Sequence, residues 1–172
     1  MEFRFVPPDL RRLDETSAEV LACAIWSDEL PMRGLAGLLD WRLAGRLSRL
    51  QRQGFLAGAL GEVLCVPVRP RLPFDKLLLF GLGPHAGFDE GIFRRVAAHL
   101  LRALEGLHVR RAVVELPGAR SGVVPVDRAT QIVLEAVGES EAHDAWWLVE
   151  DEGAERTIAQ RSADDQRRAR RA

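Results

Sequence analysis

The chain has 172 residues, of which 47% are hydrophobic and 28% charged, and its formal net charge is −1. This length and composition suit one globular domain, and the near-neutral charge argues against a general polyanion-binding protein. The N-terminus has no basic segment followed by an apolar core, and no run of about 18 apolar residues occurs, so neither a secretory signal nor a membrane span is predicted. We therefore expect a soluble, cytoplasmic protein.

The first third of the chain predicts two strands and a loop. Residues 2–6 alternate apolar and polar side chains and stop at Pro7-Pro8, a pattern typical of a short strand at the edge of a sheet. Residues 20–26 are almost wholly apolar and predict a second strand. A loop is then expected over residues 28–37.

The following segment has helical spacing and predicts one amphipathic helix that ends near Gly54. An apolar face and a basic face run along it, formed by Leu39, Leu43, Leu47 and Leu50 and by Arg42, Arg46, Arg49 and Arg52. Guanidinium groups bind phosphates, so Arg42, Arg46 and Arg49 are candidate anion-binding residues, with a solvated helix face as the alternative. No aromatic side chains interleave with the arginines for base stacking, which disfavours nucleic acid as the partner.

The stretch from residue 74 to 106 predicts a strand, a glycine turn and a helix. The apolar run from Leu77 to Phe80 suits a strand buried on both faces, and we place it at the centre of the sheet. A third strand over residues 62–68 precedes it and returns through a proline-rich loop. Asp89 is the expected N-cap of the helix, and Gly106 its C-terminal stop.

The glycine turn is a candidate ligand site, because open α/β sheets bind ligands at the carboxyl ends of strands. Its residues are Gly81, Leu82, Gly83 and, two positions further, His85. The turn has neither the GxGxxG spacing of a dinucleotide site nor the Lys and Ser/Thr of a P-loop. A plain tight turn with a surface histidine is the alternative.

The last third predicts a strand over residues 109–116, a loop over 117–125, a helix from Asp127 to Gly138 and a strand over 145–149. Trp146 and Trp147 point to opposite faces of that last strand. Both indoles cannot be buried unless both faces are covered, so this pair is a candidate interface. The charged tail, residues 151–172, is expected to be helical or disordered.

Strands that alternate with helices predict an α/β fold, a three-layer αβα sandwich with a mixed, mostly parallel sheet over residues 1–150. Cys23 and Cys65 lie in apolar runs without metal-ligand spacing and are expected to be buried thiols. The four histidines have no i, i+4 pair. No metal and no cofactor is predicted.

The order and spacing of several segments resemble the N-terminal domain of the leucyl aminopeptidases. They are Trp26-Ser27-Asp28-Glu29, Leu38-Leu39-Asp40 with Gly45, Gln53-Gly54-Phe55 leading to Gly61-Glu62, and the run from Leu77 to Gly83. The resemblance covers about residues 1–150 and implies a macrodomain-like fold. In that family the metal ions and the catalytic Lys and Arg lie in a second domain, whose Asn-Thr-Asp-Ala-Glu-Gly-Arg type motif is missing from this sequence.

This departure predicts that the chain is not a peptidase. Two functions remain open: a non-catalytic protein-binding, assembly or regulatory module, which forms a homo-oligomer or binds a separate chain, and a binder of nucleotide or ADP-ribose in the macrodomain-like cleft. The asparagine that ADP-ribose-hydrolysing macrodomains commonly use is absent, because the sequence has no Asn.

Overall fold

The computed structural model describes residues 2–138 and 142–150. The predicted tail, residues 151–172, lies outside the described residues. The elements, in chain order, are β1 (Glu2–Val6), α1 (Leu10–Asp14), β2 (Val20–Trp26), α2 (Gly34–Arg42), α3 (Arg46–Arg52), β3 (Val63–Pro67), β4 (Lys76–Gly83), α4 (Glu90–Gly106), β5 (Arg111–Val114), the 3₁₀ turn η1 (Ala119–Ser121), α5 (Val126–Gly138) and β6 (Ala145–Val149).

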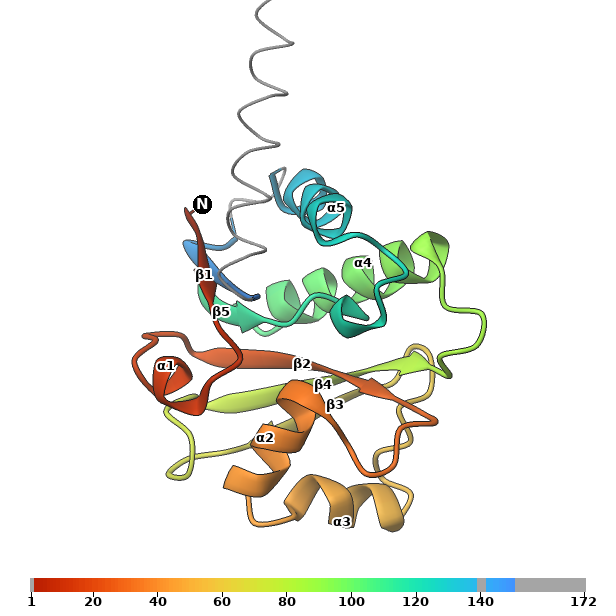
Figure 1. Ribbon diagram of the computed structural model, residues 1–172. Helices are drawn as coiled ribbons and strands as arrows, with labels where there is room; N and C mark the ends of the chain where they lie inside the picture. Colours follow the sequence, from red (N-terminus) through yellow and green to blue (C-terminus); the bar gives the residue numbers. More distant parts are fainter. Residues whose placement is uncertain (1, 139–141, 151–172) are drawn as a thin grey trace, which may run out of the picture.

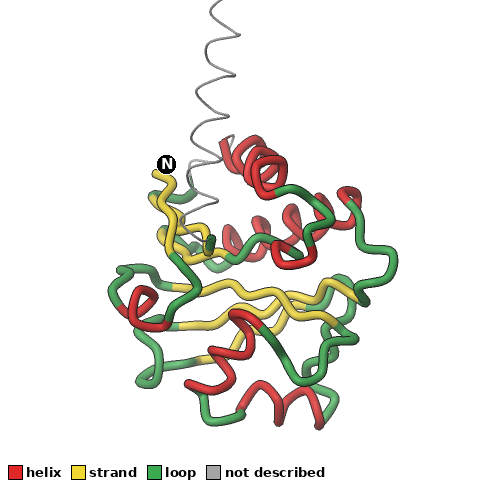
Figure 2. The backbone as a smooth tube through the Cα atoms, viewed as in Figure 1, coloured by secondary structure: helices red, strands yellow, loops and turns green. Residues whose placement is uncertain are grey.

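A single six-stranded sheet lies between two layers of helices (Figures 1 and 2). The strand order is β1-β6-β5-β2-β4-β3, and every pairing is parallel except that of β3 with β4. Helices α4 and α5 cover one face, and α1, α2 and α3 cover the other (Figure 1). The αβα sandwich with a mixed, mostly parallel sheet is therefore confirmed.

The placement of the apolar run at the sheet's centre is wrong. β4 is the longest strand, but it lies next to the edge strand β3, whereas β2 and β5 form the middle pair. The run is apolar throughout because both of its faces are covered: Leu77 and Leu79 pack with the α1–α3 side, and Leu78 and Phe80 with the α4–α5 side. A strand that lies next to the edge strand can therefore be as apolar as a central strand.

Trp146 and Trp147 point to opposite faces of β6, as predicted, but neither is exposed. Trp146 is 1% exposed and packs under α4 and α5, while Trp147 is 8% exposed and packs on the opposite face. Both faces of β6 are covered by the chain itself, because Trp146 and Trp147 belong to the buried cores on opposite sides of the sheet. The reason for the expected Trp146–Trp147 interface is therefore removed.

The single helix expected to end near Gly54 is two helices, α2 and α3, and α2 begins inside the expected loop. Ala44 and Gly45 adopt left-handed backbone angles, with φ of 55° and 74°, which end α2. The Asp40 carboxylate then caps α3, accepting hydrogen bonds from the backbone N–H groups of Leu47 at 2.8 Å and Ser48 at 3.0 Å. The spacing of the leucines predicted the buried face correctly but not the break.

The predicted cap of α4 is confirmed, whereas the expected burial of both cysteines is wrong for one of them. Asp89 caps α4 as predicted, since its carboxylate accepts a hydrogen bond from the Ile92 N–H at 2.7 Å. Cys23 is buried, but Cys65 is exposed, because it lies on the edge strand β3. In the described part of the chain, no helix has the length and apolar character needed to span a bilayer.

Candidate functional site

The chain leaves β2 toward α2 on one face of the sheet, but it leaves both parallel neighbours of β2, β5 and β4, toward α5 and α4 on the other face (Figure 1). The described sheet therefore has two positions where adjacent parallel strands lead to opposite faces, β2–β5 and β2–β4, and a crevice lies at the first. Ligands of open α/β sheets bind outside the carboxyl ends of strands at such a switch point. We call the space at this position the switch crevice; its lining includes Ala24, Glu29, Arg33, Glu115 and Arg120.

The switch crevice is filled by side chains of the protein. Arg120, from η1, pairs with Glu29, from the loop after β2, at 3.2 Å. A Cβ atom on Gly34 would lie 2.1 Å from a guanidinium nitrogen of Arg120, so only glycine leaves room for this arginine. The remaining volume is about 10 Å³, which is about the space of one water molecule.

The floor of the switch crevice holds a carboxyl and a thiol. An Oε of Glu115 accepts hydrogen bonds from the Ala24 N–H at 2.8 Å and from the Cys23 thiol at 3.3 Å. Burial raises the pKa of Glu115, and these two hydrogen bonds oppose that shift. Burial, followed by the neighbouring Glu115 charge, raises the pKa of the Cys23 thiol, which therefore stays protonated and a poor nucleophile.

The expected glycine turn is instead the end of a strand, since Gly81, Leu82 and Gly83 belong to β4, and its N–H groups make the chain's own hydrogen bonds. The Gly81 N–H donates to the Glu62 carbonyl at 2.8 Å, and the Gly83 N–H donates to the Gly58 carbonyl at 2.9 Å. Leu82 is buried in the core. The two glycine N–H groups are therefore not available to an anion.

His85 is joined to the residues after β2. Its ring stacks on Trp26 with centroids 4.0 Å apart, and its Nδ1 lies 2.7 Å from an Asp28 Oδ. This side-chain hydrogen bond holds the pKa of the Asp28 carboxyl below its usual value. The structure thus brings His85 together with Trp26 and Asp28, and Trp26 also lines the switch crevice.

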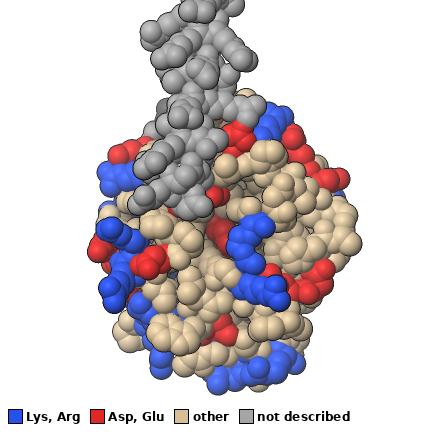
Figure 3. Space-filling view, in the orientation of Figure 1, with Lys and Arg blue, Asp and Glu red and all other residues tan. Residues whose placement is uncertain are grey.

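The predicted anion-binding arginines do not form one set. Arg42 on α2 pairs with Asp14 at 3.0 Å, and Arg46 on α3 donates to the Pro67 carbonyl at 2.8 Å. Arg49 is exposed on α3. Basic and acidic side chains are interspersed on the face of the molecule in Figure 3, without a continuous basic surface there.

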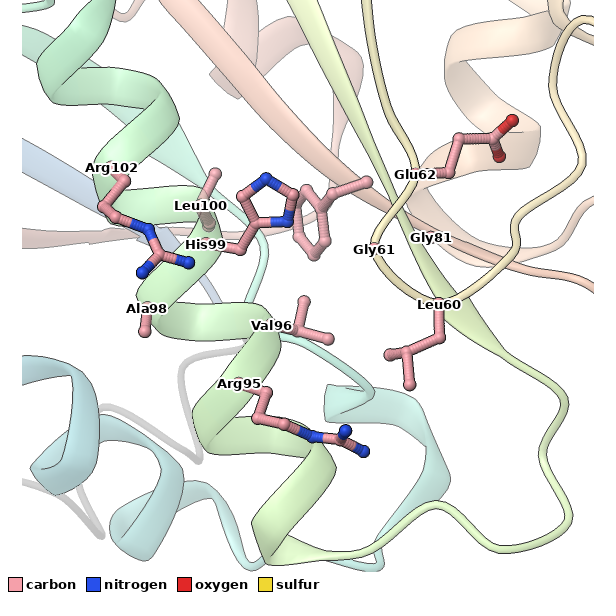
Figure 4. Close-up of a pocket in the computed structure, with 11 residues that line it drawn as sticks. Leu60, Gly61, Glu62, Gly81, Arg95, Val96, Ala98, His99, Leu100 and Arg102 are labelled. Atoms are coloured by element: carbon pink, nitrogen blue, oxygen red, sulfur yellow. The ribbon is translucent and has the colours of Figure 1, made fainter.

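A second, larger space lies beside α4, and we call it the α4 hollow. It has a volume of about 450 Å³ and lies between α4 and the loop of residues 60–62, over β4 (Figure 4). Its lining includes Leu60, Phe80, Arg95, His99 and Arg102. In the described residues, no group of three or more His, Cys, Asp or Glu side chains is placed to hold a metal ion.

Sequence reasoning missed Glu115, Arg120 and the α4 hollow. Glu115 stands directly after the apolar strand β5, and a carboxyl at the end of a buried strand is a usable signal. Arg120 lies in a glycine-rich loop, and nothing in the sequence indicates that this loop meets Glu29. The hollow depends on how α4 lies against a loop about 35 residues earlier, which no local pattern contains.

The family comparison matches most of the sheet. Residues 20–142 match the model of the cytosol aminopeptidase family, N-terminal domain, and confirm the resemblance proposed above. A probable cytosol aminopeptidase of Syntrophotalea carbinolica is 33% identical over 119 residues, which are 69% of this chain and 24% of that protein. The chain thus spans about a quarter of the length of this relative.

Solved structures with the same fold include a macrodomain and an aminopeptidase. The Trypanosoma brucei macrodomain in complex with ADP-ribose has a TM-score of 0.69 and 19% identity, and the match covers 92% of this chain and 67% of the macrodomain. A mutant of tomato leucine aminopeptidase has a TM-score of 0.61 and 16% identity, with 92% of this chain and 35% of the other covered. At these identities the likeness establishes the macrodomain-like fold alone.

The buried Glu115 predicts a pH dependence of stability. A carboxyl whose pKa is raised on folding binds its proton more tightly in the folded than in the unfolded state, so stability falls as the pH rises above the ordinary value of 4.5. For one proton the limit is about 1.4 kcal/mol per pH unit. Glu115→Gln keeps an accepting oxygen and should flatten this fall, with the largest gain over the wild type at alkaline pH.

Urea unfolding of both proteins from pH 4.5 to pH 8 measures the difference. Glu135→Gln, which alters an exposed carboxyl on α5, controls for the loss of one charge. Parallel pH profiles for the wild type and Glu115→Gln would show that Glu115 does not carry a raised pKa.

Proposed function

Because the chain belongs to the cytosol aminopeptidase family through its N-terminal domain, we propose that it is a non-catalytic protein-binding or assembly module. The match lies within the N-terminal domain of that family, and the chain is aligned to about a quarter of a curated relative. Under this proposal, the residues that hydrolyse peptides in the family lie outside the matched region.

The observation that carries this proposal is the filled switch crevice. Ligand pockets usually have volumes of about 300–1,000 Å³, whereas the crevice retains about 10 Å³. Arg120 and Glu29 satisfy each other's charge there, so a nucleotide would have to break their ion pair before it could enter. A binding module that uses its outer surface has no such requirement.

Calorimetry and light scattering test this function. Titration of the protein with ADP-ribose and with AMP should give no saturable heat, and light scattering at high concentration should detect a homo-oligomer or a complex with a defined partner chain. Hydrolysis of leucine amides with added manganese or zinc should be absent. A monomer without any partner, or chelator-sensitive hydrolysis, would contradict the proposal.

A second candidate function is binding of a nucleotide or ADP-ribose. It is favoured by the likeness to the T. brucei macrodomain, which was solved in complex with ADP-ribose. On this alternative Arg120 competes with the ligand for the switch crevice, so Arg120→Ala should bind ADP-ribose more tightly than the wild type. If neither protein gives a saturable heat in calorimetry, the alternative is ruled out.

A further inference from the structure

The α4 hollow has the size and the floor of a binding site. Its volume of about 450 Å³ falls within the usual range for ligand pockets. Phe80, Val96 and Leu100 are nearly fully buried and form an apolar floor, while Leu60 on the opposite rim is 43% exposed. An occupant that buries an apolar side chain against this floor would therefore gain hydrophobic stabilisation.

The rim of the α4 hollow is basic. Arg95, His99 and Arg102 occupy positions i, i+4 and i+7 of α4, so they share one face of the helix. The neighbouring Arg94 is paired with Glu90 at 2.8 Å. Within the described residues, neither Arg95 nor Arg102 makes an ion pair.

The one carboxylate among the described lining residues does not neutralise this rim. The Glu62 oxygens accept hydrogen bonds from the backbone N–H groups of Ala57 at 3.0 Å and Gly58 at 2.5 Å. Its carboxylate accordingly points away from α4, whereas Arg95 and His99 extend toward the side of Leu60 and Gly61 (Figure 4). The hollow therefore has positive charge at its rim without a matching negative charge inside.

The spacing of the two arginines matches that of side chains in an extended segment. Arg95 and Arg102 lie seven positions apart, which corresponds to about 10 Å along a helix. Three residues of an extended chain also span about 10 Å, so two carboxylates of one segment can each meet one arginine. The apolar floor between the arginines favours a peptide over a nucleic acid, whose backbone offers no apolar side chain.

From this geometry we infer that the α4 hollow binds an acidic segment of a partner protein, in which carboxylates flank an apolar side chain. The carboxylates pair with Arg95 and Arg102, and the apolar side chain packs on Phe80 and Leu100 beside Leu60. This inference rests on the proposed protein-binding function and names the chemistry of the partner.

Fluorescence anisotropy with a defined probe tests the inference. The probe is a fluorescein-labelled octapeptide, Gly-Ser-Asp-Leu-Leu-Glu-Ser-Gly, and its counterparts carry Asn and Gln in place of the acids or Ser in place of the leucines. The acidic probe should bind the wild type at least tenfold more tightly than either counterpart. Raising the salt concentration should weaken the binding, because the rim arginines are exposed to solvent.

Matched variants locate the site. Arg95→Gln with Arg102→Gln should lower the affinity at least tenfold and remove most of its salt dependence, whereas Arg11→Gln with Arg12→Gln, on α1 of the opposite layer, should not. Leu60→Ser should weaken binding several-fold, and Leu107→Ser, at a residue 40% exposed compared with 43% for Leu60, is its control. All of these side chains are at the surface, so the variants are expected to fold.

Three outcomes overturn the inference: no binding of the acidic probe, equal loss in the α1 control variant, or tighter binding of a single-stranded oligothymidine than of the peptide at the same arginines. If the chain still forms an oligomer or a defined complex in light scattering, such a result removes the α4 hollow as the site but leaves the proposed function in place. Peptide binding at the hollow by a protein that also titrates with ADP-ribose would support the inference and would show that the second candidate function holds beside protein binding.

Discussion

Trp146→Ala is expected to lower the free energy of unfolding by about 3–5 kcal/mol, the usual range for removal of a buried tryptophan. The indole is 1% exposed and lies under α4 and α5, where it meets Phe3 edge-on at a centroid distance of 6.4 Å. Its removal leaves a cavity between the sheet and two helices that the regular β6 backbone cannot close. Urea unfolding followed by far-UV circular dichroism measures the change.

Two variants sharpen this test. Trp41→Ala makes the same substitution at a side chain that is 75% exposed, so the unfolding free energy should change by no more than about 0.5 kcal/mol. Trp146→Phe should lose less than Trp146→Ala, because it keeps a ring and removes an indole N–H that has no hydrogen-bond partner among the described residues. Equal losses at residues 41 and 146 would contradict the burial of Trp146.

Gly81→Ala is the second change with a large expected effect. A Cβ atom at this position would lie 1.9 Å from the Ala59 carbonyl oxygen and 2.7 Å from the Gly58 carbonyl carbon. Both are backbone atoms, so no side-chain rotation relieves the overlap, and the loop that forms one wall of the α4 hollow must shift. We expect a loss of about 3 kcal/mol, the upper part of the range for overpacked sites.

The control for this prediction is Gly106→Ala, at the last residue of α4. A Cβ atom there meets nothing within 4 Å, and alanine is the better helix former, so stability should be unchanged or slightly raised. Thermal unfolding of both variants gives the comparison. A wild-type melting temperature for Gly81→Ala would mean that the loop around Ala59 does not lie against β4 as described.

The elements were predictable where their signal is local. The apolar run of β4, the Asp89 cap of α4 and the alternation of Trp146 and Trp147 all depend on neighbouring residues, and each was predicted from them. The break at Ala44 and Gly45 was also encoded locally, since Gly45 can end a helix and Asp40 can cap the next one. The leucine spacing concealed it, because both helices bury the same face.

The strand order and the candidate sites were not predictable in this way. β4 carries the strongest apolar run, yet it lies beside the edge strand because β3 turns back to pair with it. This pairing is a contact between two segments and is not contained in the apolar run itself. Glu115 meets β2 and Arg120 meets the loop after β2, in both cases about 90 positions earlier, and such long-range pairings leave no periodicity in a single sequence. The exposure of the Cys65 side chain likewise depends on the position of β3 at the edge of the sheet.

The pairing of β1 with β6 has a consequence for how the chain folds during its synthesis. Residues 2–6 are synthesised before the rest of this sheet, but their only strand partner in the described structure is residues 145–149. Until β6 emerges, β1 has no strand to pair with, and one edge of β5 stays unpaired. The sheet therefore cannot be completed in stages as the chain is synthesised. Such long-range pairing slows folding and prolongs the exposure of unpaired strand edges, which favour aggregation.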